Sequence, residues 1–136
     1  MSKGTYVQTK HLPKFQALMQ LHQNVVGGKV DGHGLAPFAA LPDKAFRFNE
    51  MMQCNGKLQA YYQSRKGADQ FQYGFCLANK VCPDEMDEWT SCFQHCQKTG
   101  ESLDACAVKK RLAENCSMKF SQDCLRLFVD YELFPK

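Results

Sequence analysis

The sequence of 136 residues lacks the features of several common functional classes. It contains no run of about 20 apolar residues, so it predicts no membrane-spanning helix. Residues 1–19 carry three lysines and no apolar core, which does not fit a secretory signal peptide. The net charge of +3 is small and dispersed. Because its densest basic run, at residues 109–111, is typical of a solvated helix face, we expect no nucleic-acid partner.

Catalytic and cofactor-binding motifs are missing as well. The sequence has no Gly-rich phosphate loop, no nucleophile elbow and no pair of catalytic carboxylates. Adjacent cysteines, which hold Cu(I), and Cys-x-x-Cys motifs, which exchange disulfides, are also absent. Zinc ligands by residue type occur at Cys92, His95 and Cys96, but their spacing is unspecific and would remove a disulfide. We therefore expect no enzymatic activity, no cofactor and no metal site.

Cysteine is abundant instead, and four of the eight cysteines are arranged symmetrically. Cys82 and Cys92, and then Cys106 and Cys116, form two Cys-x9-Cys pairs whose positions mirror each other about Thr99. In an antiparallel helical hairpin that turns there, residues equidistant from the turn face each other. Nine intervening residues leave both cysteines of a pair on roughly one side of a helix. The spacing thus predicts disulfides joining Cys82 with Cys116 and Cys92 with Cys106.

Local signals agree with this hairpin. Pro83 suits the first helical position, and the two acids after it lie at the positive end of the helix dipole. Gly100 fits a helix C-cap. Ser102 can cap the second helix, which we expect to run to about Phe120.

A second register for the hairpin uses Cys96 and Cys106, which are also separated by nine residues. It would place Gly100 inside a helix at a cost of about 1 kcal/mol relative to alanine, so we favour the first register. Cys96 and Cys124 then have no partner. We expect both to be free, buried thiols that behave as small apolar groups.

A weaker hairpin precedes the hairpin of residues 82–116 in the chain. Cys54 and Cys76 mirror each other about Arg65, which lies in a plausible turn. Asp69 is a candidate cap for the helix after that turn. The outer positions carry no cysteine, so this hairpin is expected to hold at most one disulfide, between Cys54 and Cys76.

These signals predict an all-α fold of disulfide-stapled antiparallel helical hairpins with extended N- and C-terminal arms. Residues 1–42 form an N-terminal arm with an amphipathic helix at 13–26 and a Gly/Pro-rich loop. Residues 43–80 form a degenerate first hairpin, 81–120 form the doubly stapled hairpin, and 121–136 form an apolar tail whose pattern is ambiguous between helix and strand. Apolar arms outside a stapled core predict contact surfaces for other proteins.

The cysteines also indicate a compartment. Three disulfides require an oxidising environment. Because no secretory signal accompanies them, the mitochondrial intermembrane space fits best. The first acidic residue is Asp31, as in a mitochondrial presequence, but no arginine precedes Arg47, so we expect no cleaved presequence.

The segments Cys82 to Cys92 and Cys106 to Cys116 resemble the coiled-coil-helix-coiled-coil-helix (CHCH) family, over about 35 of the 136 residues. This resemblance implies import into the intermembrane space without a presequence. It also implies oxidation there by an import machinery that recognises cysteine beside hydrophobic residues. Trp89 and Phe120 stand near Cys92 and Cys116, as such recognition requires.

Within that family, residues 85–89 and 102–105 are similar to the quadruple Cys-x9-Cys accessory subunit of respiratory complex I. The resemblance implies a non-catalytic structural subunit, peripheral on the inner membrane and bound to protein subunits of a large complex. The chain departs from the pattern because its first hairpin lacks outer cysteines, its turn is longer and its first 40 residues have no counterpart. The alternatives are a CHCH assembly or import factor, or a structural subunit of cytochrome c oxidase, a cristae scaffold or the mitochondrial ribosome.

Overall fold

The computed structural model describes residues 11–27 and 42–130, and all regular structure within these ranges is helical. The predicted all-α class is therefore confirmed. Parts of the predicted arms, residues 1–10, 28–41 and 131–136, lie outside the described residues. Among the helices that are described, none is both long and apolar enough to cross a bilayer. In chain order the elements are α1 (Gln16–Val26), α2 (Pro42–Met51), the short 3-10 helix η4 (Met52–Cys54), α3 (Asn55–Ser64), α4 (Gly67–Val81), α5 (Pro83–Thr99), the 3-10 helix η5 (Leu103–Cys106) and α6 (Ala107–Asp130).

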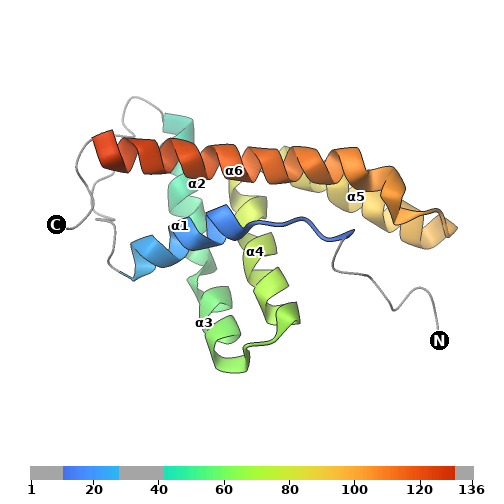
Figure 1. Ribbon diagram of the computed structural model, residues 1–136, viewed down its shortest axis with the longest axis horizontal. Coiled ribbons are helices and arrows are strands. Elements are labelled where there is room, and N and C mark those ends of the chain that lie inside the picture. The colour runs from blue at the N-terminus through green and yellow to red at the C-terminus, as the bar shows by residue number, and fades with distance from the viewer. Residues whose placement is uncertain (1–10, 28–41, 131–136) are drawn as a thin grey trace.

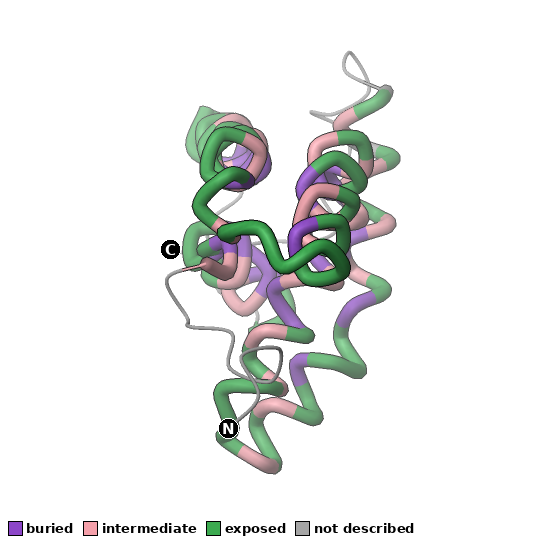
Figure 2. Tube along the Cα trace, turned by 90° about the vertical axis from the view of Figure 1, so that its right-hand side faces the viewer, coloured by how far each residue is buried: buried purple, intermediate pink, exposed green. Residues whose placement is uncertain are grey.

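Two helical hairpins lie crosswise to each other (Figure 1). In one, α5 runs beside the first half of the long helix α6. In the other, the α2–η4–α3 run lies beside α4. Helix α1 packs against both α4 and α6, so it links the two hairpins. Figure 2 shows buried residues on the sides of the helices that face one another, and they form one contiguous cluster.

The ends of α5 and the start of η5 follow the predicted signals. Pro83 occupies the first turn of α5, and Gly100 caps its C-terminus in the left-handed conformation, with φ of 79°. Glycine adopts this conformation without the steric cost that a Cβ brings. The Ser102 hydroxyl accepts a hydrogen bond from the Asp104 N–H at 3.2 Å and caps η5. The tight turn of the hairpin is thus fixed by residues that the sequence identifies.

The turn between α3 and α4 differs from the prediction at Asp69. The N-cap of α4 is Lys66, and Asp69 lies within the first turn of the helix. The Asp69 carboxylate accepts a hydrogen bond from the Ser64 hydroxyl, which itself accepts one from the Lys66 N–H at 3.1 Å. Arg65 reverses the chain with φ of 56°. Asp69 therefore braces the turn instead of capping the helix.

Helix α1 is shorter than the predicted helix at 13–26, because it begins at Gln16. The backbone N–H of Lys14 donates to the Glu114 carboxylate at 2.7 Å, which attaches the preceding segment to α6. The interpretation of this arm as a contact surface is wrong for the face of α1, because that face packs on α4 and α6 of the same chain. Its buried residues are Leu18, Leu21, His22 and Val25.

The predicted C-terminal tail continues α6 without a break as far as Asp130. Phe128 contacts Phe48 of α2 edge-on, with ring centroids 5.8 Å apart, and Lys44 of α2 forms an ion pair with Asp123. Apolar residues at every fourth position give this half of α6 one buried face: Phe120, Cys124 and Phe128. The described part of the tail therefore belongs to the core.

Candidate functional site

Three disulfides link the helices, and they are the three pairs that the mirror spacing predicts. Their Cα atoms are 5.8 to 6.2 Å apart, within the usual range. They join Cys82 with Cys116, Cys92 with Cys106, and Cys54 with Cys76. The first two close the hairpin of α5 and α6 at both ends. In the chain-entropy model, each stabilises the fold by about 3 to 4 kcal/mol.

Cys124 is one of the two free cysteines, and it is buried as predicted. Burial raises the pKa of its thiol to about 12, although the nearby Lys44 ammonium acts in the opposite direction. At neutral pH almost no thiolate forms, and the thiolate is the nucleophile and metal ligand. Cys124 is therefore a small apolar core group.

Cys96 is the other free cysteine, and its surroundings are different. Its Sγ lies 3.6 Å from the Sγ of Cys106. Together with Cys92, these sulfur atoms all lie within 4.8 Å of one another. We call Cys92, Cys96 and Cys106 the thiol cluster, although Cys92 and Cys106 are joined by a disulfide and only Cys96 carries a free thiol. Helix α5 supplies Cys92 and Cys96, which are one turn apart, and η5 supplies Cys106. The cluster sits at the turn end of the hairpin.

The sequence contained two signals for this cluster. Residues four apart on a helix lie on one face, which applies to Cys92 and Cys96. Cys96 is also nine residues from Cys106, the spacing of the second register. His95, a zinc ligand by residue type, does not belong to the cluster, because its exposed Nε2 lies 3.7 Å from the Glu101 carboxylate. A second group lies at the other end of the hairpin. The sulfur atoms of Cys82 and Cys116 and a carboxylate oxygen of Glu85 all lie within 4.8 Å of one another.

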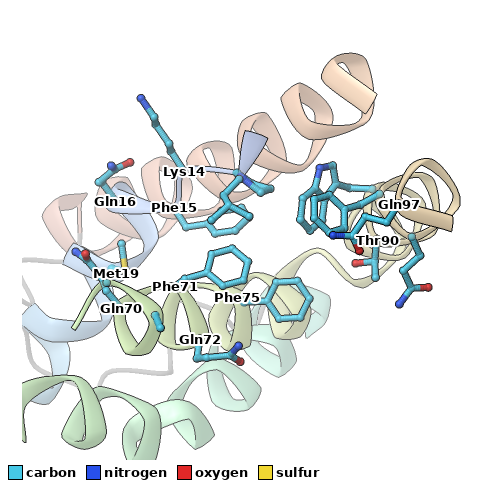
Figure 3. Close-up of a pocket in the computed structure, with 18 residues that line it drawn as sticks. Lys14, Phe15, Gln16, Met19, Gln70, Phe71, Gln72, Phe75, Thr90 and Gln97 are labelled. Atoms are coloured by element: carbon cyan, nitrogen blue, oxygen red, sulfur yellow. The ribbon is translucent and has the colours of Figure 1, made fainter. Parts of the chain in front are cut away.

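An open groove of about 840 Å³ lies between the segment leading into α1, the first half of α4 and the face of α5 that carries Trp89 and Phe93 (Figure 3). Aromatic rings contact one another along it. The centroid distances are 5.5 Å from Phe71 to Phe75, 6.4 Å from Phe75 to Trp89, and 5.1 Å from Trp89 to Phe93. Phe15 from the start of α1 faces the same space (Figure 3). These five residues form the aromatic groove.

The rim of the aromatic groove is polar but almost uncharged. Its side chains end mostly in amides, and none of its described lining residues is acidic. The lining amides are Gln16, Gln70, Gln72, Gln94 and Gln97. This composition suits contact with an apolar surface bordered by hydrogen-bonding groups, since aromatic residues are typical of protein interfaces and charged residues are depleted from their cores.

A buried histidine and tyrosine connect α1 to α4. The Nδ1 of His22 lies 2.7 Å from the Tyr73 hydroxyl, which donates to the Met19 carbonyl at 3.3 Å. Burial lowers the pKa of His22 to about 4, and burial together with the nearby Tyr62 raises the pKa of Tyr73 far above its ordinary value. Both groups are therefore neutral at pH 7. Within the described part of the chain, the His22 Nε2 atom has no hydrogen-bond partner.

Comparison with protein-family models, with curated proteins and with solved structures found no match to this chain. The described residues offer three features that bear on function. These features are a hairpin closed by disulfides at both ends, the thiol cluster at its turn, and the aromatic groove beside it.

Proposed function

We propose that the chain is a non-catalytic structural accessory subunit of mitochondrial complex I, on the intermembrane-space face of its membrane arm. One observation carries the proposal. The hairpin of α5 and α6 is closed at both ends by disulfides between two Cys-x9-Cys pairs. This is the arrangement that the CHCH resemblance implies, and residues 85–89 and 102–105 are similar to the complex I subunit of that family.

The state of the cysteines supports a structural role over a catalytic one. Six of the eight are paired in disulfides that link separate helices. Cys124 is held protonated by its burial, so it cannot act as a nucleophile at neutral pH. Cys96 is buried as well. A rigid bracket with covalent links is suited to holding other subunits at a fixed spacing.

The aromatic groove supplies the contact surface for such a role. Phe71, Phe75 and Phe93 are only partly buried although they pack against the core. Aromatic residues in a concave site dominate the binding energy of many protein interfaces. We therefore assign the partner contact to this groove, whose lining includes Phe15 from the N-terminal arm.

The disulfides support the proposed location. Three such bonds persist in an oxidising compartment. The mitochondrial intermembrane space is the oxidising compartment that the CHCH resemblance implies. The import machinery implied by the CHCH resemblance would form the bonds after entry.

Blue-native electrophoresis of mitochondria, followed by detection of the tagged chain, tests the proposal. A complex I subunit migrates with the mature enzyme, and depletion of the chain reduces that band. A CHCH assembly or import factor migrates mainly free or in small complexes. Migration with cytochrome c oxidase, a cristae scaffold or the mitochondrial ribosome would replace the complex I assignment by that assembly.

A further inference from the structure

We propose that, when the disulfide between Cys92 and Cys106 is reduced, the thiol cluster of Cys92, Cys96 and Cys106 binds one Zn²⁺ ion. The ion would then link α5 to η5 in place of the disulfide. This inference does not depend on the proposed role in complex I, because it concerns only residues within one hairpin.

The spacing of the sulfur atoms fits a tetrahedral thiolate site. Zinc–sulfur bonds of about 2.3 Å place two sulfurs of a tetrahedral site roughly 3.8 Å apart. The Sγ atoms of Cys96 and Cys106 are 3.6 Å apart without any bond between them. All three sulfurs lie within 4.8 Å of one another. Only Cys92 and Cys106 have to move apart, and breaking their bond permits that.

The surrounding helices hold the three ligands near these positions. Cys92 and Cys96 occupy one face of α5, and the turn around Gly100 brings Cys106 opposite them. The disulfide between Cys82 and Cys116 keeps the far end of the hairpin closed. A site that is largely preformed loses less conformational entropy on binding.

The cluster is reachable from one side. Cys96 and Cys106 are buried, whereas Cys92 is only partly buried and lines a shallow surface depression with His95 and Lys109. A reductant and an ion can therefore approach through Cys92. Water, or the His95 imidazole after a side-chain rotation, would occupy the fourth position on zinc.

The chemistry balances in two steps. A thiol or phosphine reductant supplies two electrons to the bond between Cys92 and Cys106, and two protons from solvent complete the two thiols. Zinc binding then releases three protons to solvent, one from each thiol, because thiolates are the ligands. Binding therefore weakens at acidic pH.

A competition titration of the full chain tests the site. A limiting amount of phosphine is added until peptide mapping finds the bond between Cys92 and Cys106 open and the other two disulfides intact, and Zn²⁺ is then titrated against a chromophoric chelator at pH 7. We expect one tightly bound ion per wild-type chain, and weaker binding by at least about tenfold in Cys96→Ala. Cys124→Ala is the matched control, because Cys124 is the other buried free thiol and lies outside the cluster. The affinity of this variant for Zn²⁺ should match that of wild type. The oxidised protein should not bind at this affinity.

Alkylation of the zinc-loaded protein, mapped by peptide mass spectrometry, locates the ion. Protection of Cys92, Cys96 and Cys106 supports the site. Alkylation of Cys92, Cys96 and Cys106 at the same rate with and without the bound ion overturns it. Equal affinity of wild type and Cys96→Ala, or equal weakening in Cys124→Ala, also overturns it.

Folding of the variant is checked separately. Cys96 takes part in no disulfide, so oxidised Cys96→Ala should keep all three disulfides and the helical content of wild type. If the alanine variant does not fold, Cys96→Ser replaces it, since serine keeps the size of the side chain but is a poor zinc ligand. Wild-type affinity in the folded serine variant would contradict the proposal.

Discussion

His22 of α1 and Tyr73 of α4 are joined by a hydrogen bond of 2.7 Å in the middle of the core. Both side chains are fully buried. Helix α1 comes from the N-terminal arm, so this contact attaches a segment distant in sequence to the hairpin of α3 and α4. Because the Tyr73 hydroxyl donates to the Met19 carbonyl, the Nδ1–H of His22 donates to the Tyr73 oxygen. Protonation of His22 would then place a charged N–H at the buried Nε2, which has no hydrogen-bond partner among the described residues.

Stability should therefore fall as the pH drops. The pKa of His22 is lowered from 6.5 to about 4 in the folded protein, so the unfolded chain binds more protons between these values. The free energy of unfolding contributed by His22 is complete above pH 6.5 and is lost as the pH falls toward 4. Urea denaturation should give a value lower by about 2 kcal/mol at pH 4.5 than at pH 7.

His22→Gln is the control for this titration. Glutamine does not ionise, so the variant should be less stable at pH 7 but should show a smaller loss between pH 7 and pH 4.5. If wild type and His22→Gln lose the same stability over this range, another group is responsible for the pH dependence.

Removal of the outer disulfide should be costly. Cys116→Ser leaves Cys82 without a partner and should lower the free energy of unfolding by about 3 to 4 kcal/mol. Cys124→Ala, which removes a thiol outside any disulfide, should lower it by only about 1 kcal/mol. Thermal and urea unfolding of both variants would measure the difference, and similar losses would contradict the structural importance of the outer bond.

Removal of Cys92 should have a smaller effect, because a replacement is close by. In Cys92→Ser, the Cys96 thiol lies near enough to Cys106 for a new disulfide to form during oxidation. Peptide mapping without reduction should find Cys96 linked to Cys106. The double variant Cys92→Ser/Cys96→Ser should instead leave Cys106 free and lose about 3 kcal/mol of stability. A free Cys106 in the single variant would argue against the proximity of these two sulfurs in solution.

The close approach of α1 to α4 depends on Gly74. A Cβ atom at this position would lie 3.3 Å from the Met19 Sδ and 3.5 Å from the Phe15 ring, so a larger side chain must separate the helices. Gly74→Leu should destabilise the protein by about 2 kcal/mol. Gly56→Leu is the control, because a Cβ at that helical position meets nothing within 4 Å and should raise stability slightly.

The aromatic groove can be tested apart from folding. Phe71→Gln reduces the apolar surface of the groove, and Tyr62→Gln removes an exposed aromatic side chain elsewhere. If the groove binds a partner subunit, Phe71→Gln should weaken assembly into the large complex by about tenfold, while Tyr62→Gln should not. Blue-native electrophoresis measures assembly, and circular dichroism confirms that both purified variants are folded. Normal assembly of folded Phe71→Gln would exclude the groove as the contact.

Much of the hairpin was predictable because its constraints are local or symmetric. The positions of Cys82, Cys92, Cys106 and Cys116 determine which residues can face each other once the chain turns at Gly100. Glycine, proline and serine at helix ends act within a few residues of themselves. Such signals do not depend on the rest of the fold.

The placement of α1 and the length of α6 were not predictable in the same way. An amphipathic pattern indicates that α1 has an apolar face, but the sequence does not show which surface covers it. Likewise, α6 continues beyond Phe120 to a part where Phe128 packs on Phe48 of α2, a contact between residues 80 positions apart. The aromatic groove combines residues of the consecutive helices α4 and α5 with Phe15 from the start of α1, which is distant in sequence, so no local pattern reveals it. The thiol cluster has a signal in Cys96, but its spacing to Cys106 equally fits a competing register of the hairpin and does not by itself indicate a cluster.

Helix α6 has 24 residues and spans about 36 Å, yet different forces hold its two halves. The first half is tied covalently to the α4–α5 junction through Cys116, and η5 just before it is tied to α5 through Cys106. The second half, after Phe120, contacts α2 through the rings of Phe128 and Phe48 and through the ion pair of Asp123 with Lys44. Thermal motion can therefore separate the C-terminal half of α6 from α2 while all disulfides stay intact. Separating the N-terminal half from α5 first requires reduction of the disulfides.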